Sequence, residues 1–144
     1  MSAQLHNHDF YTWTHQQAEL LREGRFNELD TEHLIEELAS MGARERRELG
    51  NRLAILLAHL LKWQYQPHLR GSSWRQSIRN ARIAVEKIVK DSPSLKSAIA
   101  PAVADEYKNA KADAVDETGL RDDLFPTVCP YSEANLLSHD YWPE

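Results

Sequence analysis

The chain has 144 residues, 42% hydrophobic and 27% charged, which is typical of one globular domain rather than of a disordered segment. The single cysteine, Cys129, excludes an internal disulfide and a cysteine-rich zinc site, and no apolar run approaches the roughly 20 residues that span a bilayer. The first ten residues lack the pattern of a secretory signal. We therefore expect a single domain over residues 1–144, located in the cytoplasm without membrane contact.

The net charge of −5 is the balance of three unequal segments. Residues 1–43 carry 2 basic and 8 acidic side chains, residues 44–90 carry 11 and 3, and residues 91–144 carry 4 and 11. The acidic flanks either fold against the basic middle and neutralise it, or leave it facing an anionic partner. We favour neutralisation, because the flanks of a single domain necessarily lie near its middle.

Helical periodicity dominates from the start of the chain, and no strand alternation is visible. The pattern predicts a first helix from about Asp9 to Glu23, ended by Gly24. Asp30 is a good N-cap for a second helical pattern, over residues 31–66. A straight helix of that length would be about 54 Å long, in a domain about 37 Å across. Such a helix either extends beyond the domain into a partner or breaks, and we favour a break or sharp kink at Met41-Gly42-Ala43.

The segment from Leu53 to Trp63 is apolar on nearly every face, so we expect it in the middle of a helical bundle. Further helices are predicted where capping patterns begin or end them, at Ser73 with Gln76, Ser92 with Pro93, Pro101, Gly119 and Ser132 to Leu137. The fold class is all-α: a single helical bundle of about five or six helices with an irregular C-terminal cover. That cover uses Phe125, Leu136, Leu137, Tyr141 and Trp142.

Several phrases of this sequence occur together in one known family. They include Asp9-Phe10-Tyr11-x-Trp13, Glu36-Glu37-Leu38-x-x-Met41-Gly42, His59 through Pro67, Asp91-Ser92-Pro93 and Cys129-Pro130-Tyr131. In this order they make the whole chain resemble the bacterial Domain of Unknown Function 29 family. The resemblance implies an all-helical protein and brings no established activity. The chain departs from the family pattern at Ala43-Arg44, where a serine cap is expected, and at His68, where an acidic residue is expected.

The chain has seven histidines, which could supply metal ligands. Neither a Glu-x-x-His pair nor a His-Glu-x-x-His motif is present, and His6 and His8 fall in a terminus that we expect to be frayed. We therefore predict no metal and no cofactor. An alternative is a metal-dependent enzyme in which the fold assembles ligands around His59, such as Glu37 and Glu45. The simpler interpretation of His59 is a neutral core histidine bonded to a carbonyl or carboxylate.

Basic and aromatic side chains alternate from Lys62 to Arg82, which could stack bases and neutralise phosphates. Arg75, Arg79 and Arg82 are spaced to share one helix face. The alternative is a helix–loop–helix corner with buried tryptophans and solvated arginines, which we favour. The candidate binding residues are His59, Lys62, Trp63, Tyr65, Arg70, Trp74, Arg75 and Arg79.

No motif assigns a catalytic residue. The hypothesis that we prefer is a non-enzymatic bacterial interaction or regulatory protein with an unidentified protein partner, and self-association stays open. The alternatives are a nucleic-acid-binding module that uses residues 44–90, which we do not favour, and the metal-dependent enzyme at His59.

Overall fold

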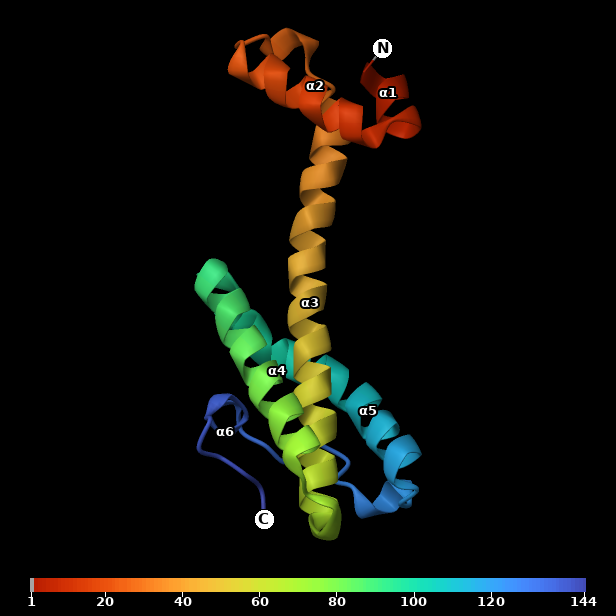
Figure 1. Ribbon diagram of the computed structural model, residues 1–144, viewed down its shortest axis with the longest axis vertical. Coiled ribbons are helices and arrows are strands. Elements are labelled where there is room, and N and C mark those ends of the chain that lie inside the picture. The colour runs from red at the N-terminus through yellow and green to blue at the C-terminus, as the bar shows by residue number, and fades with distance from the viewer. Residues whose placement is uncertain (1) are drawn as a thin grey trace. The chain divides into compact units, whose positions relative to one another are not determined.

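The computed structural model describes residues 2–144, with side chains from residue 4 onward, and this part of the chain is helical without strands. Its α-helices are α1 (Ser2–His8), α2 (Phe10–Arg22), α3 (Thr31–Tyr65), α4 (Ser72–Asp91), α5 (Ile99–Thr118) and α6 (Glu133–Leu137) (Figure 1). Short 3-10 turns lie at Phe26–Glu28, Pro67–Leu69, Pro93–Ala98 and Asp122–Leu124. The predicted all-α bundle is confirmed.

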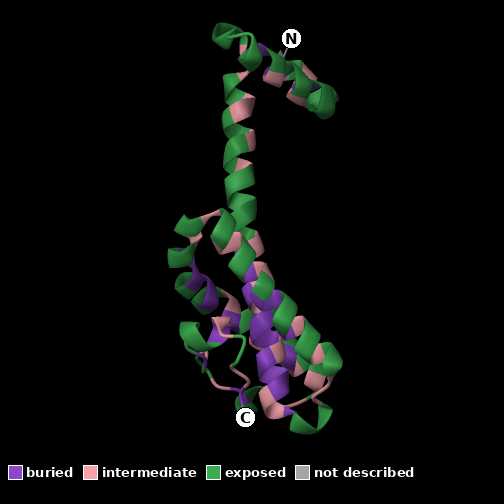
Figure 2. Cartoon of the chain, turned by 60° about the vertical axis from the view of Figure 1, so that its left-hand side comes forward, coloured by how far each residue is buried: buried purple, intermediate pink, exposed green. Residues whose placement is uncertain are grey.

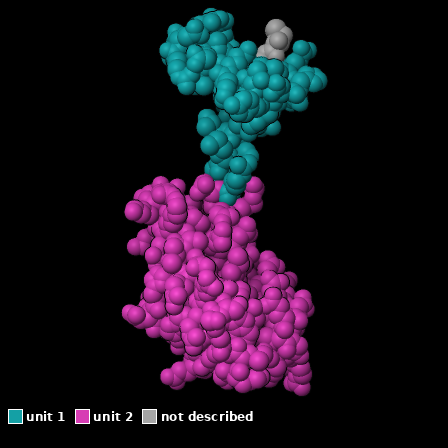
Figure 3. Space-filling model, in the orientation of Figure 1, with its two compact units in different colours: residues 1–44 teal, residues 45–144 magenta. Residues whose placement is uncertain are grey.

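The chain divides into two compact units, residues 1–44 and residues 45–144 (Figure 3). We call them the N-terminal unit and the C-terminal unit, and describe each by itself. The prediction of one domain over residues 1–144 is not tested by this division and stays a prediction.

The core of the C-terminal unit is built around the second half of α3, as the apolar run predicted (Figure 2). Ile55 is 40% exposed, whereas six leucines of this half-helix are fully buried: Leu49, Leu53, Leu56, Leu57, Leu60 and Leu61. Residues of α4 and α5, among them Ile78, Val85, Ile99 and Tyr107, complete the cluster. The buried leucines are stable only when neighbours cover them, and residues of α4, α5 and the tail pack in the same cluster.

The C-terminal tail covers this core, as predicted. Phe125 and Leu136 are buried, and Leu137, Tyr141 and Trp142 pack against the cluster. The Ser132 side chain accepts a hydrogen bond of 3.1 Å from the amide of Asn135 and so caps α6. The tail therefore belongs to the core of the C-terminal unit.

The predicted break at Gly42 is wrong, because α3 runs without interruption from Thr31 to Tyr65. Gly42 does not adopt the left-handed conformation of a helix-ending glycine. A glycine inside a helix costs only about 1 kcal/mol, and its neighbours Met41, Ala43 and Arg44 are good helix formers. No N-cap residue follows that could start a new helix.

Other helix ends were predicted with mixed success. Asp9 caps α2 by accepting a hydrogen bond from the amide of Thr12, and Gly24 and Gly119 have φ of 70° and 71°, as expected of C-terminal caps. The predicted side-chain caps at Ser73 and Ser92 are wrong: α4 begins at Ser72 after Gly71, and Ser92 makes no capping hydrogen bond. The terminus containing His6 and His8 is the helix α1 rather than a frayed end.

Candidate functional site

The predicted binding residues all lie in the C-terminal unit, where several of them contact one another. The guanidinium groups of Arg70 and Arg75 lie 5.1 and 5.4 Å from the centre of the Trp63 ring. The Lys62 ammonium lies 5.6 Å from the Trp74 ring and pairs with Glu117 of α5. These cation–π contacts build the helix–loop–helix corner that the sequence allowed.

Several basic side chains between Lys62 and Arg82 are engaged in contacts within the C-terminal unit. Arg70 donates hydrogen bonds to the backbone carbonyls of Trp63 and Pro143. Arg82 is fully buried and donates to three carbonyls of the tail, so the expectation that it shares an open face with Arg75 and Arg79 is wrong. The tail packs over that part of α4, which a helical spacing within α4 alone could not indicate.

The remaining candidates lie apart from this corner or at its edge. Arg75 and Arg79 are exposed, and Tyr65 packs on Phe125 with ring centres 5.1 Å apart. His59 is half-buried and donates from Nδ1 to the carbonyl of Ile55 at 2.8 Å. Burial lowers the pKa of His59, which keeps the ring neutral near pH 7. This is the simpler of the two roles that the sequence allowed for His59.

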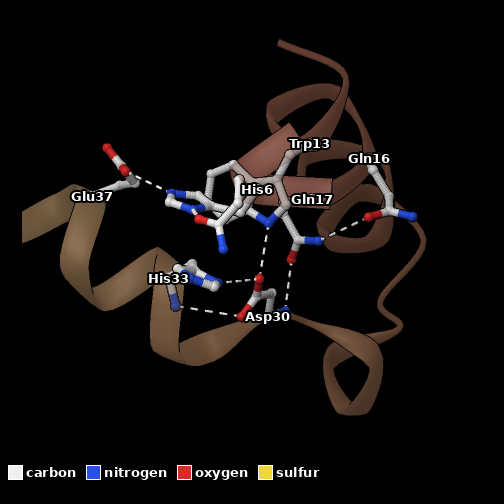
Figure 4. Close-up of polar contacts among 8 residues, drawn as sticks. His6, Trp13, Gln16, Gln17, Asp30, His33 and Glu37 are labelled. Atoms are coloured by element: carbon white, nitrogen blue, oxygen red, sulfur yellow. Dashed lines mark hydrogen bonds and ion pairs between the residues drawn. The ribbon is translucent and has the colours of Figure 1, made fainter. Parts of the chain in front are cut away.

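The N-terminal unit holds a polar cluster centred on Asp30 (Figure 4). Asp30 accepts hydrogen bonds from the Trp13 indole at 3.0 Å and from Nδ1 of His33 at 2.7 Å. Its backbone amide donates to the Gln17 side chain at 2.8 Å. Burial acts to raise the pKa of Asp30, but the bonds from His33 and Trp13 outweigh it and lower the pKa. This one carboxylate therefore joins the start of α3 to α2.

A second part of this cluster attaches α1. The His6 ring stacks on His33 with centres 3.9 Å apart, and Nε2 of His6 donates to Glu37 at 2.8 Å. The hydrogen bond to Glu37 raises the pKa of His6. His6 also meets the rings of Phe10 and Trp13 edge-on, so α1 is held mainly through one histidine.

Beside the polar cluster, α2 and the first part of α3 enclose an apolar groove of about 450 Å³. Its lining residues follow helical spacing on both helices: Phe10, Trp13, Thr14, Gln17, Ala18 and Leu21 from α2, and Leu34, Glu37, Leu38, Met41 and Arg44 from α3. Each helix thus contributes one continuous face. The groove is therefore formed by two regular helix faces rather than by irregular loops.

Large apolar side chains of the groove are open to solvent. Phe10 and Leu21 are 48% and 49% exposed, and Leu38 and Met41 are 65% and 57% exposed. The polar lining residues Gln17 and Glu37 are already hydrogen-bonded within the unit. The groove therefore presents mainly apolar contact surface, which is the mark of a binding site on a protein surface.

A family model described as Domain of unknown function DUF29 matches residues 5–142. The chain belongs to the DUF29 family. The resemblance found in the sequence is thereby confirmed, and the family description assigns no activity. No curated protein and no solved structure matches the chain.

Two further observations on this DUF29 protein bear on the sequence hypotheses. Among the described residues, no helix is long and apolar enough to cross a membrane. Within the same residues, no group of three or more His, Cys, Asp or Glu side chains is arranged to hold a metal ion.

Sequence reasoning missed the groove of this DUF29 chain, although a signal for it was present. The apolar positions Leu34, Leu38 and Met41 repeat at intervals of four and three residues, like the seam of a coiled coil. Such a stripe indicates a helix face that packs against another element, but not which element that is.

Proposed function

We propose that this protein is a non-enzymatic interaction protein, and that the groove of its N-terminal unit binds an amphipathic helix of another polypeptide chain. The observation that carries the proposal is the exposure of Phe10, Leu21, Leu38 and Met41 along one groove. Contiguous apolar surface of this kind is costly in water and is normally covered by a partner.

A helix is the occupant that the lining favours. Both walls are helix faces about three turns long, with side chains at spacings of three and four residues. A partner helix with apolar residues at the same spacing can interlock with such faces, as helices do in helix-in-groove recognition. The groove offers no unpaired backbone edge that an extended strand would need.

A defined probe tests this proposal. A labelled peptide of about 18 residues carries leucines at helical spacing, with lysine and glutamate elsewhere, and a scrambled peptide of equal composition is the control. We expect saturable binding of the helical probe to the full chain, measured by fluorescence anisotropy. Leu38→Glu should weaken it by at least about tenfold, because it places a charge in the apolar groove.

The matched control is Ile35→Glu, at an equally exposed apolar residue of α3 that does not line the groove. Binding should survive this change. A probe that binds the wild type and Leu38→Glu equally well would contradict the proposal. The titration is repeated at several protein concentrations, since a chain already seated in the groove would compete with the probe.

A further inference from the structure

The N-terminal unit lacks a core of its own. Among its described side chains, the buried apolar ones are Trp13 and Leu20. A unit of 44 residues is near the size at which chains usually need a disulfide, a metal or association with another chain. The single cysteine lies outside this unit, which leaves no internal disulfide. Further apolar burial in the groove is therefore the way in which this unit can gain stability.

One segment with the required spacing is part of the groove itself. Leu34, Leu38 and Met41 form a stripe along α3 with intervals of four and three residues. Such a stripe packs into a matching face of another helix. Because the stripe lines the groove, two copies of the chain can each fill the groove of the other in a two-fold symmetric, self-complementary contact.

The charges on the lining favour one orientation of this contact. Glu37 and Arg44 both line the groove and lie seven residues, or two turns, apart. If two α3 helices cross antiparallel near residues 40 and 41, Glu37 of each copy lies opposite Arg44 of the other. A parallel crossing would instead bring Glu37 against Glu37. Residues 1–44 carry 3 basic and 8 acidic side chains, but repulsion between two such units is screened beyond about 8 Å at physiological salt.

We infer that the groove is occupied by a second copy of this chain. In the resulting dimer, Leu34, Leu38 and Met41 of each copy pack into the groove of the other, and Glu37 pairs with Arg44 across the two-fold axis. This inference rests on the proposed function, and it names the chain that supplies the helix.

The molar mass of the full chain in solution tests the inference. The chain weighs 16.6 kDa, so light scattering after gel filtration should give a mass of about twice that value. Leu38→Glu should raise the dissociation constant by at least about 100-fold, because two charges enter an apolar contact. Ile35→Glu should leave the dimer intact. Circular dichroism is the control that both variants are folded. A monomer at about 100 µM, or equal loss from both substitutions, would overturn the inference.

A charge exchange tests the orientation. Arg44→Glu and Glu37→Arg each place like charges together in the symmetric dimer, so each variant alone should associate more weakly than the wild type. Mixing the two variants restores both Glu–Arg pairs and should yield a heterodimer that associates more tightly than either variant alone, although the Glu37→Arg copy loses its bond from His6. A mixture that associates no better than either variant alone would contradict the antiparallel contact.

The outcomes for the inference and for the proposed function differ. A monomer that binds the leucine probe in the groove would overturn the inference that a second copy occupies it, and would leave the proposed helix-binding function in place. A monomer that does not bind the probe overturns both. A dimer whose dissociation constant is unchanged by Leu38→Glu would overturn the inference. Binding of the leucine probe would then test the proposed function separately.

Discussion

Nε of Arg82, on α4, donates a hydrogen bond of 2.8 Å to the backbone carbonyl of Leu136 in the C-terminal tail. The same guanidinium also donates to the carbonyls of Asn135 and Tyr141, at 3.2 and 2.9 Å. One side chain thus donates to three tail carbonyls, among them that of the fully buried Leu136. Arg82 therefore attaches the tail to the core of the C-terminal unit.

Replacing Arg82 should destabilise the protein. Arg82→Met removes the three hydrogen bonds while keeping most of the apolar stem, and should lower the free energy of unfolding by about 3 kcal/mol. Arg79→Met, one turn earlier on the same helix and exposed, should change it by less than about 0.5 kcal/mol. Urea denaturation measures both values. Equal effects would show that Arg82 contributes no more than a surface residue.

A charge in the buried second half of α3 should prevent folding of the C-terminal unit. Leu60 is fully buried, so Leu60→Asp places a carboxylate among apolar side chains without a partner. We expect loss of the cooperative thermal transition by circular dichroism. Ile55→Asp is the control, since Ile55 lies on the same helix and is 40% exposed. A soluble Leu60→Asp variant with the melting temperature of the wild type would show that this helix is peripheral.

The attachment of α1 should depend on pH through His6. The hydrogen bond to Glu37 raises the pKa of His6 above 6.5, while His33 stacks on its ring and Glu36 lies nearby. The link therefore stabilises the fold fully below pH 6.5, and this contribution is lost as the pH rises through the raised pKa. An NMR titration should show this raised value, and Glu37→Gln should bring it down. An unchanged titration in Glu37→Gln would argue against the His6–Glu37 bond.

Ser132 caps a helix in the structure, whereas Ser92 was predicted to cap one and does not, so substitutions at the two positions should differ in their cost to stability. Ser132→Ala should cost about 1 kcal/mol, because the Ser132 side chain accepts the amide hydrogen bond of Asn135. Ser92→Ala should cost less than half as much, since Ser92 makes no capping hydrogen bond. Thermal or urea unfolding of the two variants gives the comparison. A larger loss from Ser92→Ala would mean that the turn before Pro93 is capped after all.

The basic segment should not bind nucleic acid at physiological salt. Arg70 and Arg82 are bonded to backbone carbonyls, which leaves Arg75 and Arg79 as the exposed part of the predicted set. Binding to duplex or single-stranded DNA that appears only at low salt should depend on Arg75 and Arg79. The double variant Arg75→Gln with Arg79→Gln should then reduce the slope of log binding constant against log salt concentration by about two. Binding that persists at physiological salt and is abolished by these two changes would favour the nucleic-acid hypothesis instead.

The sequence by itself determined the helical class, the central segment and several helix ends of this protein. Residues 53–63 are apolar on nearly every face, and such a segment is stable only when most of its surface is buried. Asp9, Gly24 and Gly119 act through bonds and backbone angles within a few residues, so a short window suffices to predict them. The family was likewise visible in short phrases.

The tertiary structure alone decided which side chains are buried in contacts and which stay exposed to solvent. Spacing places Arg75, Arg79 and Arg82 on one helix face, yet the tail, more than 50 residues away along the chain, buries Arg82 and leaves the others exposed. The groove depends in the same way on two helices meeting at Asp30, whose carboxylate accepts a hydrogen bond from Trp13 and whose backbone amide donates one to Gln17. Contacts between residues far apart in sequence depend on how whole elements pack, and helical periodicity shows which face of a helix is apolar but not which element covers it.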